Sequence, residues 1–127
     1  MMGPLKRVPV LVGNDAELPC DVLPTMANDH MLLVVWYRND SPVYSYDKPI
    51  LGPSAHWLEE AFVGRASWEN ALSVLHIRNV QPHDRDIYRC RVDFLLSPTK
   101  NYQIALDVIG KKYIVFQNKY VLLSSRR

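Results

Sequence analysis

The chain has few of the features that define several common classes of protein. Its 127 residues include only five glycines and two cysteines, and they contain no Walker loop, Gly-x-Gly-x-x-Gly fingerprint or Gly-x-Ser-x-Gly nucleophile turn. Fifteen Lys and Arg against thirteen Asp and Glu give a net charge of only +2, too balanced for a dedicated nucleic-acid binder. The longest apolar runs, such as Met31–Trp36, are far shorter than the roughly 20 residues that span a bilayer.

Short β-prone stretches separated by turn clusters fill most of the sequence. Apolar and polar residues alternate in several of them, and others are rich in β-branched and aromatic residues. This pattern is typical of an all-β sandwich or barrel, with His56–Phe62 expected as the one brief helical turn. The clearest expected strands are Ala16–Val22, Leu32–Trp36, Ile87–Phe94 and Tyr102–Ile109.

The two cysteines, Cys20 and Cys90, admit three interpretations when they are taken alone. They could be inert buried groups, a nucleophile with a bystander, or the two halves of a disulfide. A disulfide would close a loop of about 70 residues and would imply an oxidising compartment. Their spacing does not decide between these interpretations, but the neighbouring residues do.

Those neighbours resemble the signature of an immunoglobulin domain. Cys20, Trp36 and Cys90 occur in the order in which that fold places a Cys on strand B, a Trp on strand C and a Cys on strand F. Tyr88 stands two residues before Cys90, the position of the tyrosine corner. The resemblance implies an immunoglobulin-like β-sandwich with Greek-key connections, a Cys20–Cys90 disulfide and Trp36 packed against it.

Two further residues indicate a variable-type, or V-set, domain. Arg65 at the expected start of strand D and Asp84 in the E–F turn stand where V-set domains pair an arginine with an aspartate. The stretch between Trp36 and Arg65 is long enough for strands C′ and C″. One residue departs from the pattern: Asp86 occupies a position that is usually Gly, and a positive φ there would cost an aspartate some energy.

Several segments resemble the first immunoglobulin domain of the Sidestep family, which are neuronal cell-surface receptors of insects and other arthropods. The specific match is Tyr-Arg-Cys-Arg-Val-Asp-Phe at Tyr88–Phe94, followed by Ser-Pro-Thr-Lys-Asn at Ser97–Asn101. The resemblance covers about Val8–Ile109, which we expect to be the V-set domain. Further matches are Leu18–Asp21, Val35–Arg38, Pro42–Asp47, His56–Trp57 and Gly64–Ala66.

The resemblance to Sidestep receptors implies a function at the cell surface. The parent protein would be a type I membrane receptor that binds Beaten-path-type immunoglobulin receptors in axon guidance and cell adhesion, and this chain would be its membrane-distal module. The alternatives are homophilic adhesion or a soluble immune-type immunoglobulin domain. A secreted metal protein or enzyme is a less favoured alternative of a different class, because the implied disulfide uses both thiols and the histidines are scattered. We therefore expect no catalytic site, metal or cofactor, and the four histidines are His30, His56, His76 and His83.

V-set domains usually recognise partners through the outer face of the GFCC′C″ sheet. Because side chains alternate along a strand, inward-facing Trp36 and Cys90 place their neighbours outward. Tyrosine and arginine on such a face are typical of interaction hot spots. The expected partner-binding residues are Leu33, Val35 and Tyr37 on C, Tyr44 and Tyr46 on C′, and Arg89, Arg91 and Asp93 on F, with Gln103, Ala105 and Asp107 also facing out on G.

An alternative would leave that face inactive. In it, strand C″ or the loop after C′ covers Leu33 and Val35, and the two arginines pair with Asp93 and Asp107.

Three remaining segments complete the sequence-based expectations. Asn39-Asp40-Ser41 is an N-glycosylation sequon in the expected C–C′ turn, although Pro42 disfavours its use. Residues 1–7 are expected to be an N-terminal extension without a signal peptide, because no apolar core of seven or more residues precedes Gly13. Residues 110–127 contain five basic and no acidic residues, and we expect a truncated linker there rather than a membrane-surface element.

Overall fold

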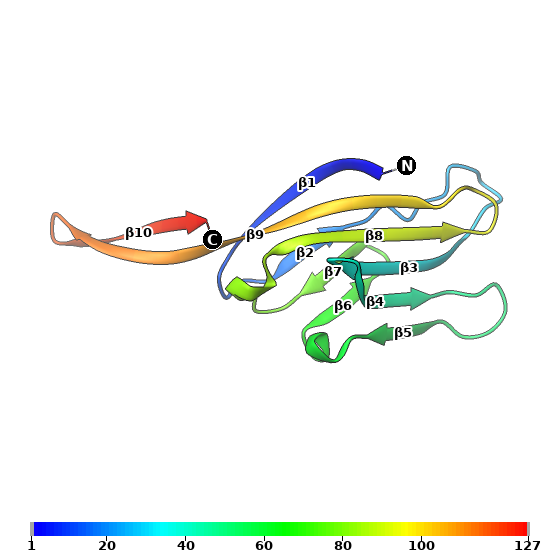
Figure 1. Ribbon diagram of the computed structural model, residues 1–127, viewed down its shortest axis with the longest axis horizontal. Helices are drawn as coiled ribbons and strands as arrows, with labels where there is room; N and C mark the ends of the chain where they lie inside the picture. Colours follow the sequence, from blue (N-terminus) through cyan, green and yellow to red (C-terminus); the bar gives the residue numbers. More distant parts are fainter. Residues whose placement is uncertain (1, 127) are drawn as a thin grey trace.

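The computed structural model describes residues 2–126, with side chains described for residues 3–110 and 117–118, and its strands form a two-layered β-sandwich (Figure 1). The larger sheet contains β1 (Met2–Leu11), β3 (Met31–Arg38), β4 (Ser41–Asp47), β5 (Ala55–Leu58), β8 (Asp86–Phe94), β9 (Lys100–Phe116) and β10 (Lys119–Arg126). The smaller sheet contains β2 (Ala16–Pro19), β6 (Ala66–Glu69) and β7 (Val74–Ile77).

The strand order confirms the predicted V-set sandwich. The larger sheet runs β1-β9-β8-β3-β4-β5, with β10 also paired to β9, and the smaller sheet runs β2-β7-β6. All pairs are antiparallel except β1 with β9, which are parallel. The apolar residues of alternating strands fill the space between the sheets, as expected for two facing sheets.

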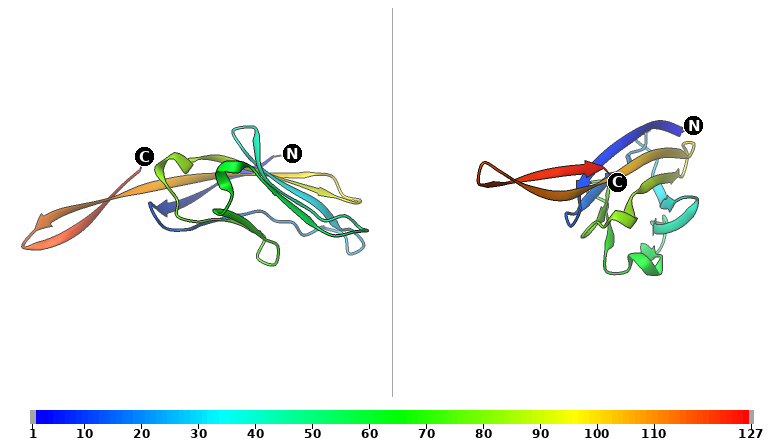
Figure 2. Two further views of the ribbon diagram at one scale, coloured as in Figure 1. Left: turned by 90° about the horizontal axis from the view of Figure 1, so that it is seen from below. Right: turned by 60° about the vertical axis from the view of Figure 1, so that its left-hand side comes forward.

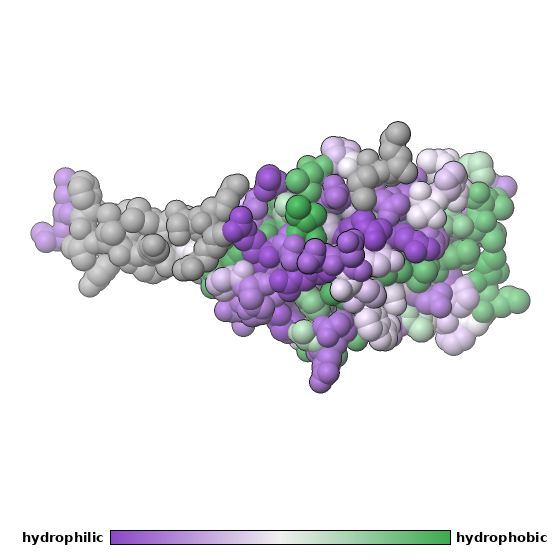
Figure 3. All heavy atoms as spheres, viewed as in Figure 1, coloured by the Kyte–Doolittle hydropathy of each residue, from purple (hydrophilic) through white to green (hydrophobic). Residues whose placement is uncertain are grey.

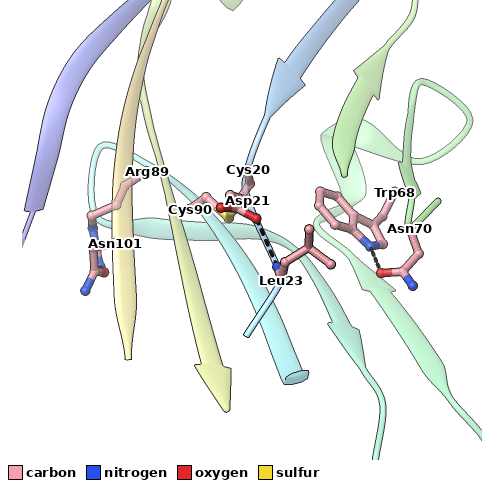
Figure 4. Close-up of a disulfide and its surroundings, with 8 residues drawn as sticks. All are labelled: Cys20, Asp21, Leu23, Trp68, Asn70, Arg89, Cys90 and Asn101. Atoms are coloured by element: carbon pink, nitrogen blue, oxygen red, sulfur yellow. Dashed lines mark hydrogen bonds between the residues drawn. A yellow bond between two sulfur atoms is a disulfide. The ribbon is translucent and has the colours of Figure 1, made fainter. Parts of the chain in front are cut away.

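A disulfide between Cys20 and Cys90 joins the two layers, as predicted. The two Cα atoms lie 6.2 Å apart, and both residues are buried. Trp36 pairs directly with Cys90 across β3 and β8, and its ring centroid lies 6.4 Å from that of Trp68 on the smaller sheet. Both cysteines and both tryptophans belong to the buried core between the sheets, and Figure 4 shows the bridge together with Trp68.

The predicted ion pair between Arg65 and Asp84 is also present. Nη2 of Arg65 lies 2.6 Å from Oδ2 of Asp84, whose side chain is only 1% exposed. The backbone N–H of Gln81 donates to the same carboxylate. Asp84 ends the short 3₁₀ helix η2 (Pro82–Asp84), so this ion pair closes one end of the sandwich.

Two local expectations require correction. The segment expected to be a helical turn, His56–Phe62, instead begins within strand β5, and only Glu60–Phe62 forms a 3₁₀ turn, η1. Asp86 has no positive φ, since it begins β8 with an extended backbone. Its carboxylate accepts hydrogen bonds from Arg38 Nε at 3.2 Å and from the N–H of Ile87 at 2.8 Å, so an aspartate fits this position well.

The two terminal segments are both strands. Residues 2–7, expected to be an extension, lie in β1 and pair with β9 from Asn101 onward. At the other end, β9 continues past Ile109 into a hairpin with β10, and both views of Figure 2 show this hairpin extending away from the rest of the fold. Strand pairing does not establish which residues fold independently, so the domain boundaries at Val8 and Ile109 stay a prediction.

Candidate protein-recognition face

The outer surface of β3 and β8 carries most of the residues predicted to bind a partner. The cross-strand register places Leu33 opposite Asp93, Val35 opposite Arg91, and Tyr37 opposite Arg89. Cross-strand pairs share one face of a sheet, and all six side chains are partly exposed. We call this surface the recognition face, and it consists of Leu33, Val35, Tyr37, Arg89, Arg91 and Asp93.

One arginine of the recognition face is neutralised within the protein. Nε and Nη2 of Arg91 donate to the carboxylate of Asp93 at 3.0 and 2.8 Å, and the hydroxyl of Thr99 donates to it at 2.8 Å. Asp93 raises the pKa of Arg91, and Arg91 in turn lowers the pKa of Asp93. The alternative in which the arginines of this face pair with neighbouring carboxylates is therefore correct for Arg91 and Asp93.

Arg89 is held in place without being neutralised. Its guanidinium carbon lies 4.1 Å from the centre of the Tyr37 ring, and Nη1 donates to Oδ1 of Asn101 at 3.0 Å. Figure 4 shows Arg89 and Asn101 on the side of β8 opposite to the disulfide. Among the described residues, no carboxylate forms an ion pair with Arg89. A cation–π contact and a neutral hydrogen bond orient its charge but leave it available to an external anion.

Strand β9 contributes less exposed surface than expected. Gln103 is partly exposed, but Ala105 and Asp107 are buried. Strand β1 lies alongside β9, and its Arg7 donates to Asp107 at 3.2 and 3.4 Å. Contrary to the prediction, Ala105 and Asp107 are therefore not accessible to a partner.

The placement of Tyr44 and Tyr46 on the outer face was wrong. Tyr44 pairs with Trp36 and Tyr46 with Val34, and since both of those residues face the core, so do the tyrosines. Tyr44 is 3% exposed and Tyr46 8% exposed. His56 of β5 contacts both, through a hydrogen bond to the Tyr44 hydroxyl and through ring packing against Tyr46.

The outward positions of β4 are Ser45 and Asp47 instead. Ser45 pairs with Val35 on one side and with Trp57 of β5 on the other. Trp57 is 48% exposed and adds an aromatic side chain at the edge of the recognition face. Strand β5 thus lies beside the face and does not cover Val35.

An exposed apolar cluster at the ends of three loops was missed by sequence reasoning. The loops follow β2, β4 and β8, and in Figure 3 hydrophobic residues gather at the end of the sandwich where these loops lie. A groove of about 600 Å³ lies between the first two loops. We call this cluster the loop end, and it consists of Leu23, Met26, Ile50, Leu51, Leu95 and Leu96.

A buried aspartate connects two of these loops. Asp29, which is 3% exposed, accepts hydrogen bonds from the N–H groups of Leu96 and Ser97 at 2.8 and 2.9 Å and from the Ser97 hydroxyl. Its own loop contributes a further N–H, from His30. The loops after β2 and β8 are therefore held together by one carboxylate.

The less favoured alternative, a metal protein that uses the histidines, would need a cluster of ligands. Within the part of the chain that the structure describes, no three His, Cys, Asp or Glu side chains gather closely enough to hold an ion. No helix among the described residues is long and apolar enough to cross a membrane.

The sandwich, the bridging disulfide and the Arg65–Asp84 pair define an immunoglobulin-type domain. The sequence matches the immunoglobulin V-set domain family over residues 4–120, so the chain belongs to this family.

Known proteins similar to this chain include a butyrophilin-like protein and the Ig-like domain of an antigen. Mouse butyrophilin-like protein 2 is 38% identical over 99 residues, which cover 72% of this chain and 21% of that protein. The chain therefore spans about a fifth of the length of this relative. The first Ig-like domain of human CD48 antigen superposes with a TM-score of 0.70 at 24% identity, covering 92% of this chain and 93% of that one.

A second similar structure is domain 1 of VCBP3 from Branchiostoma floridae, with a TM-score of 0.65 and 23% identity over 81% of this chain and 89% of that one. Identities this low establish the shared fold alone. None of these similarities points to the Sidestep family.

Proposed function

We propose that this domain is an extracellular recognition module that binds a protein partner through the recognition face. The observation that carries the proposal is a row of outward Leu33, Val35 and Tyr37 beside Arg89, whose charge is oriented but not neutralised. A solvated sheet face normally presents polar residues at such alternate positions. The Cys20–Cys90 disulfide supports an extracellular location, since structural disulfides persist in oxidising compartments.

The partner class is a finer proposal with two candidates. The sequence resemblance to Sidestep receptors favours heterophilic binding to a Beaten-path-type immunoglobulin receptor in axon guidance and cell adhesion. The 38% identity to a butyrophilin-like protein favours an immune-type domain instead. In both cases the parent protein would present this domain at a cell surface.

The chemistry of the face suggests how it would bind. Burying Leu33 and Tyr37 against an apolar patch would supply affinity, whereas Arg89 would orient the partner and accelerate association. Truncating one such anchor is expected to cost on the order of 2 kcal/mol of binding free energy. Arg91 should contribute less, because Asp93 already neutralises it.

The test is binding of the domain to two panels of purified ectodomains, one of Beaten-path-type receptors and one of butyrophilin-type proteins. We expect Tyr37→Ala and Val35→Asp to weaken binding at least tenfold, with unchanged thermal melts. Arg78→Glu is the control, because Arg78 is exposed and follows β7 on the smaller sheet. Equal binding by the wild type and the three variants would place the interface elsewhere. If the wild type bound neither panel, both partner classes would be excluded.

A further inference from the structure

We infer that the recognition face pairs with the same face of a second copy of this chain, with Arg89 of each copy against Asp47 of the other. The inference rests on the proposed function, because it uses the same face and names its partner. The proposed assembly is an isologous homodimer, in which both copies use the same face. The positions of two charged residues and one apolar residue support it.

On the outer face of the described part of the larger sheet, these two charges have no ion pair with an opposite charge. Arg89 has the ring of Tyr37 and the amide of Asn101 as its contacts. Asp47, at the end of β4, is exposed, and its carboxylate forms no hydrogen bond or ion pair with any described residue. The remaining charged groups of this surface are already paired, Arg91 with Asp93 and Arg7 with Asp107.

These two charges lie at opposite corners of the face. Asp47 pairs with Leu33 near the start of β3, whereas Arg89 pairs with Tyr37 near its end. They are therefore four residues apart along the strands and two strands apart across the sheet. Strand dimensions put them about 17 Å from each other.

Val35 lies at the midpoint of this diagonal. It is on β3, the strand between β4 and β8, and it is halfway between Leu33 and Tyr37. A two-fold axis in the plane of the interface, perpendicular to the diagonal, would stack Val35 on Val35 of the other copy. The same rotation places Arg89 over Asp47 of the other copy and Asp47 over its Arg89, which satisfies the self-complementarity that a two-fold interface requires.

The chemistry of the interface follows from this symmetry. Each ion pair occurs twice, on both sides of an apolar centre formed by Leu33 and Val35. Such a centre excludes water and strengthens the charge pairs at its border. The net charge of +2 per chain opposes association only weakly. A homodimer would cover the face that binds any other protein, so self-association would regulate heterophilic binding by competition.

The test is sedimentation equilibrium of the full 127-residue chain over a range of protein concentrations. We expect a monomer–dimer equilibrium in the wild type. Arg89→Glu and Asp47→Arg alone should each raise the dimer Kd about tenfold or more, because each reversal creates two like-charge contacts. The double variant Arg89→Glu with Asp47→Arg should return the Kd to within about threefold of the wild type, since it exchanges the two charges.

Arg78→Glu is the matched control, since it makes the same charge change on the other sheet, and thermal melts monitor folding. A wild type that stays monomeric to about 0.5 mM would overturn the inference. The inference would also be overturned if Arg89→Glu changed the dimer Kd no more than Arg78→Glu does. It would be overturned as well if the double variant did not restore the Kd. The proposed function is judged separately, since a monomeric domain that binds another ectodomain through Tyr37 and Val35 would retain it.

Discussion

The hydroxyl of Tyr88 donates a 2.6 Å hydrogen bond to the backbone carbonyl of Asp84, and the carboxylate of the same Asp84 accepts from Arg65. Asp84 therefore connects three segments. These are strand β8, which carries Cys90, the turn that precedes β8, and the segment at Arg65 that leads into β6. Burial raises the pKa of Tyr88 well above its usual value, so the hydroxyl stays protonated and keeps donating at pH values where an exposed tyrosine would ionise.

Replacing Arg65 with Ala should destabilise the domain strongly. The change leaves the buried Asp84 carboxylate without its cation, and we expect a loss of about 3 kcal/mol in the free energy of unfolding. Arg38→Ala is the comparison, because its pair with Asp86 is partly exposed and should be worth about 1 kcal/mol or less. Urea denaturation measures both, and equal losses would show that burial of Asp84 does not set the cost.

Removing the disulfide should also destabilise the domain strongly. Cys20→Ala or Cys90→Ala is expected to cost about 2–5 kcal/mol, because the bridge restrains a long loop in the unfolded chain and lies in the core. Chemical denaturation of each variant gives the value, and wild type unfolded without reductant should show no free thiol. Two reactive thiols in that wild-type sample would contradict the bridge.

Acidification should release the connection between two loops at Asp29. Burial raises the pKa of this carboxyl, but hydrogen bonds from Ser97, Leu96 and His30 outweigh burial and lower the pKa to about 2 from an ordinary value of 3.8. Because the folded pKa lies below the unfolded one, the stability that Asp29 contributes is complete above about pH 4 and is lost as the pH falls toward 2.

An NMR titration of the Leu96 and Ser97 amides measures this transition. We expect their shifts to change with a midpoint of about 2 in the wild type. Asp29→Asn should remove the transition, because an amide side chain does not titrate. A midpoint close to 3.8 in the wild type would mean that the hydrogen bonds do not favour the ionised form.

Asn39 should be glycosylated when the domain passes through a eukaryotic secretory pathway. Asn39 and Asp40 form the exposed two-residue turn between β3 and β4, both with positive φ, so the sequon is accessible. We expect partial occupancy, seen as a mass shift that a glycosidase removes and that Asn39→Gln lacks. Pro42→Ala should increase the occupied fraction, and an unmodified protein with either residue at position 42 would contradict the prediction.

Sequence reasoning succeeded where a residue with a known direction fixed the alternation. Trp36 and Cys90 face the core, so the outward positions of β3 and β8 followed from them. On β4 there was no such reference, and consecutive residues Val43 and Tyr44 are both buried next to a register shift at Trp36/Tyr37. Simple alternation therefore could not give the direction of Tyr44 and Tyr46.

The hydrogen bonds of Asp29 could not be predicted from the sequence for a different reason. Asp29 stands in a turn-like segment where a solvated carboxylate is the ordinary interpretation, and its partners at Leu96 and Ser97 are more than 60 residues away. No local periodicity connects the two loops. Asp47 likewise gained importance only when the structure showed which neighbouring charges were already paired.

The parallel pairing of β1 with β9 also determines how the domain responds to tension. Met2 and the end of the paired part of β9 at Ile109 lie at opposite ends of this two-stranded ribbon. A force that pulls these two points apart acts along both strands, so it loads the hydrogen bonds between them together rather than opening them one after another. The β1–β9 pair at the edge of the sandwich is thus loaded in shear by such a force.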